Sequence, residues 1–136
     1  MRWIVPMMRL TQMFLLLSGI GFMLIGINTF RDPIAAMAGV ELGVQSINAL
    51  NEVRANYGGM QMGIGILLFS AIWLPWLSRP ALLALSLITG GLVVGRFVSM
   101  MLDGMPNTTV QALLILEFVT TIAALFLFFR HTKSAE

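Results

Sequence analysis

Four long apolar runs, interrupted only by Arg96 and Glu117, restrict the fold of this 136-residue chain more than any other feature. A helix needs roughly 20 apolar residues to cross the hydrocarbon core of a bilayer. The runs therefore predict membrane-spanning helices at 10–30, 55–78, 80–102 and 107–129. Hydrophobic residues make up 58% of the sequence and charged residues 10%, which is more apolar surface than one soluble core can bury. We expect an all-α polytopic membrane protein in which four transmembrane helices form one antiparallel bundle.

The connection between the first two spans, at 31–56, is too long for a tight turn and too apolar for a free linker. Pro33 suits the start of a short helix, and Ser46 suits the N-cap of a helix that continues into the second span. We expect this connection to be an interfacial segment. Pro80 and Pro106 are expected in the first turns of the third and fourth spans, because proline is tolerated there.

Basic residues in the loops predict the orientation, because cytoplasmic loops carry an excess of lysine and arginine. One side of the membrane would carry Arg2, Arg9, Arg79, Arg130 and Lys133, and the other Arg31 and Arg54. Trp3, Trp73 and Trp76 lie near the more basic side, where interfacial anchors are expected. We therefore expect a bacterial inner-membrane protein with both termini in the cytoplasm.

Glu117 stands at the centre of the last apolar run. A charge at the centre of a spanning helix costs about 2.5–3.5 kcal/mol on insertion scales, so such a residue normally faces other helices and has a partner. The preferred partner is Arg96, whose long side chain could reach Glu117 between antiparallel spans three and four. We expect Glu52, Asp103 and Arg54 to complete a buried network, which either fixes helix register or lines a polar cavity open to the outer side.

Helical geometry gives the second span two faces that are not built for lipid. Gly59 and Gly63 share one face with Glu52, and the opposite stripe consists of Arg54, Gly58, Gln61 and Gly65. Either one stripe packs within the bundle while the other ends near the interface, or the second stripe contacts another subunit. On the third span, Gly91 and Gly95 form a GxxxG step that lets a partner backbone approach closely.

Several motifs together resemble a bacterial family of small four-helix inner-membrane proteins of unknown function, close to AciT-like proteins. The resemblance covers most of the chain and rests on a set of short segments: Asn51-Glu52-Val53-Arg54-Ala55-Asn56-Tyr57-Gly58-Gly59, Gly95-Arg96-Phe97-Val98-Ser99, Asp103-Gly104-Met105-Pro106 and Leu116-Glu117. It implies a homotrimer with an envelope role, and it adds Asn51 and Tyr57 to the candidate site. Ser99 belongs to the same candidate site because it shares a face of the third span with Arg96 and Asp103. DoxX-type four-helix proteins share the architecture but fit these motifs less well.

Two functions remain in competition. The first is a non-enzymatic, homo-oligomeric membrane module that supports the envelope or binds lipid or a partner. The alternative is a small oligomeric ion channel or proton-linked carrier that uses Glu117 and Arg96. An enzyme is not expected, because the sequence contains no catalytic triad or phosphate loop and its one histidine, His131, lies in the tail. We expect no cofactor, no metal site and, with a net charge of only +2, no nucleic-acid partner.

Overall fold

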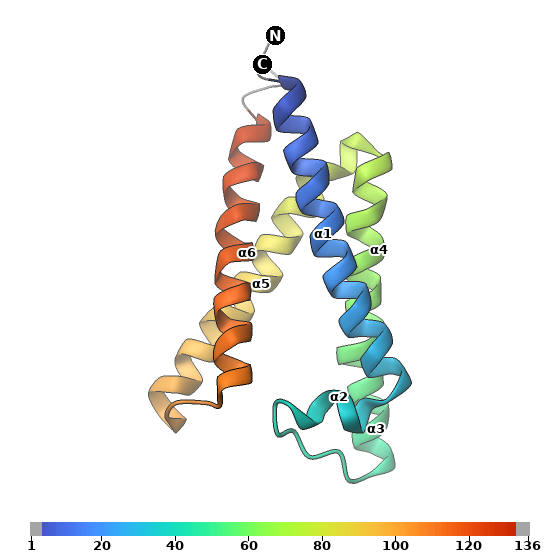
Figure 1. Ribbon diagram of the computed structural model, residues 1–136, viewed down its shortest axis with the longest axis vertical. Helices are drawn as coiled ribbons and strands as arrows, with labels where there is room; N and C mark the ends of the chain where they lie inside the picture. Colours follow the sequence, from blue (N-terminus) through green and yellow to red (C-terminus); the bar gives the residue numbers. More distant parts are fainter. Residues whose placement is uncertain (1–3, 133–136) are drawn as a thin grey trace. The chain divides into compact units, whose positions relative to one another are not determined.

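A computed structural model describes residues 4–132 and, within them, the side chains of residues 8–130. The described chain is helical. In chain order, the helices are α1 (Ile4–Arg31), α2 (Pro33–Ala38), α3 (Ile47–Val53), the π-helix η1 (Arg54–Gly59), α4 (Met60–Trp73), α5 (Pro75–Asp103) and α6 (Thr108–Thr132). Figure 1 shows them in sequence colours. Arg2, Trp3 and Lys133, which the orientation argument used, lie outside the described residues, as does the side chain of His131.

The chain divides into two compact units. The first, Gln12–Pro75, contains most of α1 together with α2, α3, η1 and α4, and we call it the α1–α4 unit. The second contains the start of α1 through Thr11 and the chain from Trp76 onward, and we call it the α5–α6 unit. Each unit is described by itself below.

Within the described residues, three helices are long and apolar enough to cross a membrane. They contain the segments Met8–Arg31, Pro75–Asp103 and Thr108–Arg130. The predicted helices at 10–30, 80–102 and 107–129 are thus confirmed as long apolar helices, although α5 begins at Pro75 and contains Pro80 in its interior. Neither proline therefore lies in the first turn of a helix, where the sequence predicts it. Pro106 precedes α6, which begins at Thr108, and the Asn107 side chain accepts a hydrogen bond from the Val110 N–H at the N-terminus of α6.

The predicted helix at 55–78 differs from the structure at both ends. Its first residues belong to the π-helix η1, and its α-helical part ends at Trp73. Leu74 leaves the helix at φ −115° and ψ 89°, since the ring of the following Pro75 disfavours the α conformation in the residue before it. Residues 75–78 therefore belong to α5, and the predicted bounds of the second span are wrong at both ends.

The short helices between α1 and η1 begin where the sequence predicts. The Asp32 side chain accepts a hydrogen bond from the Ala35 N–H at 3.1 Å, and Pro33 occupies the first turn of α2. Ser46 caps α3 through its bond from the Ala49 N–H, also at 3.1 Å. Both caps satisfy backbone donors that have no partner within their own helix.

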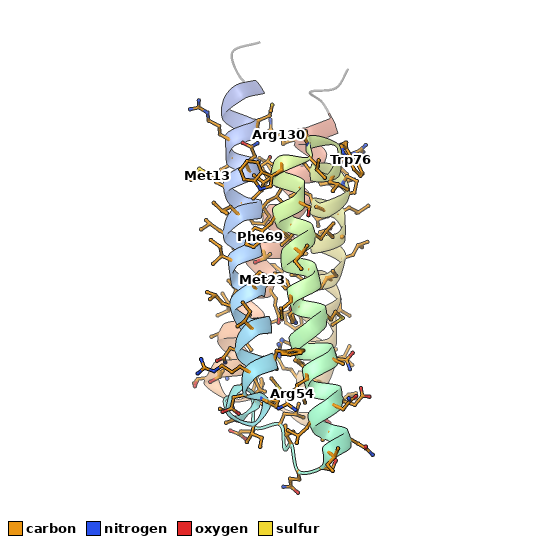
Figure 2. The ribbon with its side chains drawn as sticks, turned by 90° about the vertical axis from the view of Figure 1, so that its right-hand side faces the viewer. Met13, Met23, Arg54, Phe69, Trp76 and Arg130 are labelled. Atoms are coloured by element: carbon orange, nitrogen blue, oxygen red, sulfur yellow. The ribbon has the colours of Figure 1, made fainter. Side chains whose placement is uncertain are left out.

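Glycines allow α1 to approach η1 and α4 closely within the α1–α4 unit. A Cβ added to Gly26 would lie 2.8 Å from the backbone nitrogen of Met62, and one added to Gly58 would lie 3.2 Å from the Cα of Phe30. A Cβ added to Gly19 would meet the ring of Phe69, and one added to Gly65 would meet the Met23 side chain and lie 3.2 Å from the Gly19 carbonyl oxygen. Figure 2 shows Met23 and Phe69 along this contact. The interface is therefore built on direct contact between backbones, as in membrane helix pairs.

In the α5–α6 unit, one stripe of α5 is buried at helical spacing. It consists of Ser78, Ala81, Leu82, Leu85, Ser86, Thr89 and Val93. From α6, Ala124 and Leu127 are buried. Near one end of the unit, the guanidinium of Arg79 lies 4.8 Å from the ring centre of Phe128 and that of Arg130 lies 5.1 Å from that of Phe126. Trp76 and Arg130 mark this end in Figure 2.

Large apolar side chains cover the outside of the long helices. Leu17 is 66% exposed, Leu87 67% and Phe129 64%. A soluble monomer rarely presents continuous apolar surface on this scale, and such surface marks contact with lipid or protein.

Candidate functional site

An ion pair joins the two long helices of the α5–α6 unit. Arg96 Nε donates to Glu117 Oε2 at 2.6 Å, and Arg96 Nη2 donates to Glu117 Oε1 at 2.8 Å. The contact is bidentate, which gives it geometric specificity as well as strength. The Arg96 and Glu117 side chains are 25% and 12% exposed, so the pair is partly buried. The predicted pairing of Arg96 with Glu117 is confirmed.

Threonine hydroxyls continue the contact between α5 and α6. Thr89 Oγ1 donates to the carbonyl of Leu85 and lies 2.8 Å from Thr121 Oγ1. Thr121 Oγ1 also lies 2.8 Å from the Glu117 carbonyl, and its single proton can serve only one of these two acceptors at a time. Glu117 is therefore held by its carboxylate and is adjacent, through its backbone, to a second polar link between the helices.

The other predicted charges do not join this pair in a buried network, and that prediction is wrong. Asp103 is exposed and accepts a hydrogen bond from Ser99 at 2.9 Å. Glu52 is also exposed, and it accepts one from Asn56 at 2.9 Å. Each acid lies near a helix end and accepts its hydrogen bond from a residue four positions away in the same helical segment. No charged side chain in the described part of the chain is buried.

Arg54 makes a different kind of contact, at the C-terminal end of α1. Its Nε donates to the carbonyl of Phe30 at 3.2 Å. The last carbonyls of a helix lack intrahelical partners and carry partial negative charge, so a guanidinium is a favourable cap there. Arg54 begins η1, and single π turns inside α-helices are frequent at functional sites. Sequence periodicity gave no sign of this π turn.

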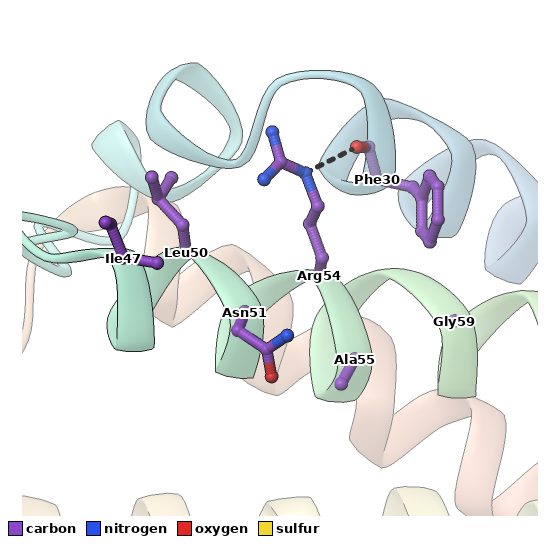
Figure 3. A pocket seen from close by; sticks show the side chains of 7 residues that line it. All are labelled: Phe30, Ile47, Leu50, Asn51, Arg54, Ala55 and Gly59. Carbon is purple, nitrogen blue, oxygen red and sulfur yellow. Dashed lines mark hydrogen bonds between the residues drawn. The ribbon is translucent and has the colours of Figure 1, made fainter.

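A cavity of about 430 Å³ lies beside this contact within the α1–α4 unit. Its apolar lining comes from Phe30, Ile47 and Leu50, and its polar lining from Asn51 and Arg54. Figure 3 shows Arg54 reaching from its helix to the backbone of Phe30. Among the described residues, neither the terminal nitrogens of Arg54 nor the side-chain amide of Asn51 has a hydrogen-bond partner. Ala55 and Gly59 complete the wall without bulky side chains.

The structure thus brings Asn51 and Arg54 to one cavity and Arg96 and Glu117 to one ion pair. Tyr57 is 46% exposed and does not line the cavity. Within the described residues, no three or more His, Cys, Asp or Glu side chains gather in a way that could hold a metal ion.

The packing glycines differ from those selected by sequence. Among the described residues of its own unit, and apart from its own helix backbone, nothing lies within 4 Å of a Cβ added to Gly63, Gly91 or Gly95, and at Gly59 only the Arg54 carbonyl lies at ordinary contact distance. The glycines in close contact include Gly26 and Gly58 instead. Gly58 and Gly65 of the stripe that contains Arg54 therefore pack on α1 of the same chain, which favours the alternative in which a stripe of the second span packs within the chain. Equal seven-residue spacings, Gly19 to Gly26 and Gly58 to Gly65, are the signal that could have identified this interface.

Comparison with known proteins gives one result. Residues 10–128 match the model of a family described as a domain of unknown function (DUF4345). No curated protein matches the chain, and no solved structure matches it. The match agrees with the expected membership in a family of unknown function, and it supports no more specific family.

Proposed function

The chain belongs to the DUF4345 family, and we propose that it is a non-enzymatic, multipass inner-membrane protein that assembles with copies of itself and supports the envelope by binding lipid or a partner. The observation that carries the proposal is the outer face of α5. There, Gly91 and Gly95 meet no described atom of the α5–α6 unit outside their own helix, and Val94 and Val98 beside them are 63% and 44% exposed. A GxxxG step on an apolar face lets a second helix approach closely in a membrane.

The proposal includes four spans. Backbone dihedrals at the junctions Arg54, Gly59 and Met60 are all in the right-handed helical region, so α3, η1 and α4 form one continuous helical path. From Ile47 to Trp73 this path is on the order of 40 Å long at 1.5 Å per residue, enough to cross a bilayer. The π turn at its start widens the helix without ending it.

The orientation follows from charge and from aromatic anchors. Trp73 and Trp76 are 82% and 71% exposed, as expected of side chains at a membrane–water interface. Arg79 and Arg130 lie at the same end of the α5–α6 unit as Trp76, which favours a cytoplasmic location for that end. Both termini are then cytoplasmic, and α2 and α3 form an interfacial segment on the outer face.

Native mass measurement of the full chain in lipid nanodiscs tests the assembly. We expect an oligomer, with a trimer favoured by the sequence resemblance, and we expect Gly95→Leu to shift the mass toward monomer because its side chain blocks close approach. Gly21→Leu is the matched control, since Gly21 also faces open space but lies on α1. A monomeric wild-type protein would contradict the proposal, as would equal behaviour of the two variants.

A second candidate is the ion or proton-linked carrier, favoured by the position of Arg96 and Glu117 inside long apolar helices. It ranks second because both Glu117 oxygens already accept hydrogen bonds from Arg96. Ion and proton flux in proteoliposomes separates the two candidates. Flux that is lost in a folded Glu117→Gln variant would favour the carrier, whereas flux unchanged by that substitution would exclude Glu117 from its path.

A further inference from the structure

The cavity between the C-terminal end of α1 and the start of η1 combines a cation with an apolar wall. Arg54 uses Nε to cap α1, and its terminal nitrogens carry further donors that no described residue accepts. Phe30, Ile47 and Leu50 line the same cavity. A ligand that satisfies both halves has an anionic head and a hydrocarbon portion.

The charge around the cavity favours an anion. Arg54 is the one charged residue in its lining. The nearby acids do not line the cavity: the Glu52 carboxylate accepts a hydrogen bond from Asn56, and the Asp32 carboxylate caps α2. Arginine is also suited to bind phosphate oxygens through two parallel hydrogen bonds.

The position of the cavity favours a lipid as the source of that anion. Phe30 is the last residue of the apolar part of α1, and Arg31 follows it. If α1 spans the membrane, as the proposed function requires, Phe30 lies where hydrocarbon gives way to head groups. At about 430 Å³, the cavity has the size of a small-molecule site, so it can hold a head group and the first part of an acyl chain.

We infer that this cavity binds the phosphate head group of an anionic membrane phospholipid, with the terminal nitrogens of Arg54 on the phosphate and Phe30, Ile47 and Leu50 against the start of the acyl chain. Asn51 adds an amide donor at the rim. The small side chains at Ala55 and Gly59 keep the space open. This inference rests on the proposed membrane location and names the lipid that the module holds.

Native mass spectrometry of the full-length protein, titrated with phosphatidylglycerol or with zwitterionic phosphatidylcholine, tests the inference. We expect selective retention of phosphatidylglycerol, and Arg54→Gln should weaken it about tenfold, the effect of losing one charge-assisted contact. Arg31→Gln is the matched control, because Arg31 is an exposed arginine at the same end of α1 that does not line the cavity. It should bind phosphatidylglycerol like wild type.

A second variant protects the test against a folding defect in Arg54→Gln, which also loses the cap on Phe30. Ala55→Phe leaves that hydrogen bond intact and places a ring at an exposed position in the cavity wall. It should reduce phosphatidylglycerol binding while helicity measured by circular dichroism stays unchanged. Unchanged binding in both Arg54→Gln and Ala55→Phe would overturn the inference, as would equal losses in Arg54→Gln and Arg31→Gln.

Two further readouts separate the possible sources and the underlying proposal. Inorganic phosphate that displaces phosphatidylglycerol at comparable concentration would identify a free anion as the ligand and overturn the lipid assignment. The same spectra report oligomer mass. A monomer whose phosphatidylglycerol binding is weakened by Arg54→Gln would contradict only the proposed assembly. An oligomer whose phosphatidylglycerol binding is unchanged by Arg54→Gln would contradict only this inference.

Discussion

Arg96 and Arg54 both lie inside helical segments, yet their guanidinium groups bind different kinds of partner. Arg96 is held by two hydrogen bonds to the carboxylate of Glu117, whereas Arg54 donates through Nε to the neutral carbonyl of Phe30. A carboxylate cancels a positive charge, but a helix-end carbonyl offsets only part of it. The α5–α6 unit thus contains a neutralised ion pair. The α1–α4 unit contains a guanidinium whose terminal N–H groups donate to no described residue.

The positions of the two residues explain the difference. Arg96 continues the buried stripe of α5 beyond Thr89 and Val93, where an uncompensated charge would be costly. Arg54 lies just beyond the apolar part of α1 and beside a cavity, where a ligand or head group can approach it. Arg96 thus links two helices, whereas Arg54 has terminal N–H donors beside a cavity that a ligand can enter.

Removing the carboxylate is expected to have the largest effect. Glu117→Ala leaves Arg96 without its bidentate partner on a partly buried face, and breaking such a pair costs about 3 kcal/mol. The unfolding midpoint in a mild detergent should fall accordingly. Arg54→Ala, which removes a hydrogen bond to a neutral carbonyl, should cost only about 1 kcal/mol by the same measurement.

A double variant determines whether the charge pair itself is needed. Arg96→Met combined with Glu117→Leu replaces the pair by apolar groups of similar length, and such replacements are often neutral or stabilising. We expect most of the stability lost in Glu117→Ala to return. A double variant as unstable as the single one would mean that both residues contribute through contacts other than their mutual pair, and the contrast with Arg54 would fail.

The sequence was sufficient to predict the α5–α6 unit in some detail. Long apolar runs specify helices by length alone, and an acid and a base embedded in neighbouring runs have few partners other than each other. The capping residues Asp32 and Ser46 were equally predictable, because short polar side chains before an apolar run satisfy free N–H groups.

The α1–α4 unit was less predictable for physical reasons. A π turn changes the hydrogen-bond register over a few residues, and side-chain periodicity carries little trace of it. Helical geometry assigned Glu52 and Asp103 to faces but not to depths, so it could not show that both are exposed near helix ends. The cavity depends on the distance between α1 and η1, which only the packed backbones determine.

Enlarging a contact glycine is expected to have the next largest effect. A Cβ at Gly26 would lie 2.8 Å from the Met62 nitrogen and 2.9 Å from the Gly58 carbonyl, so Gly26→Ala forces backbones apart. Overpacking of this kind costs about 2 kcal/mol. The unfolding midpoint should fall, and phosphatidylglycerol binding should fall with it if the Arg54 cavity depends on the spacing of α1 and η1.

Gly63→Ala is the matched control, because the added methyl group meets no atom within 4 Å. Its unfolding midpoint should equal or slightly exceed that of wild type, since alanine is the better helix former. Equal destabilisation by both substitutions would show that α1 does not approach α4 through Gly26, and the cavity would lose its structural basis.

The smallest expected effect concerns the hydroxyl contact next to the ion pair. Thr121→Val removes the link to Thr89 between α5 and α6 while keeping the shape of the side chain. Interhelical hydrogen bonds in membranes average about 0.6 kcal/mol, so the unfolding midpoint should fall only slightly. Ser86→Ala is the control, since Ser86 Oγ bonds to the Leu83 carbonyl of its own helix and its loss should be smaller still. If Thr121→Val lowered the unfolding midpoint as much as Glu117→Ala, the hydroxyl contact would stabilise the α5–α6 pair as strongly as the ion pair does. The contribution of Arg96 to stability would then differ less from that of Arg54 than its bidentate contact implies.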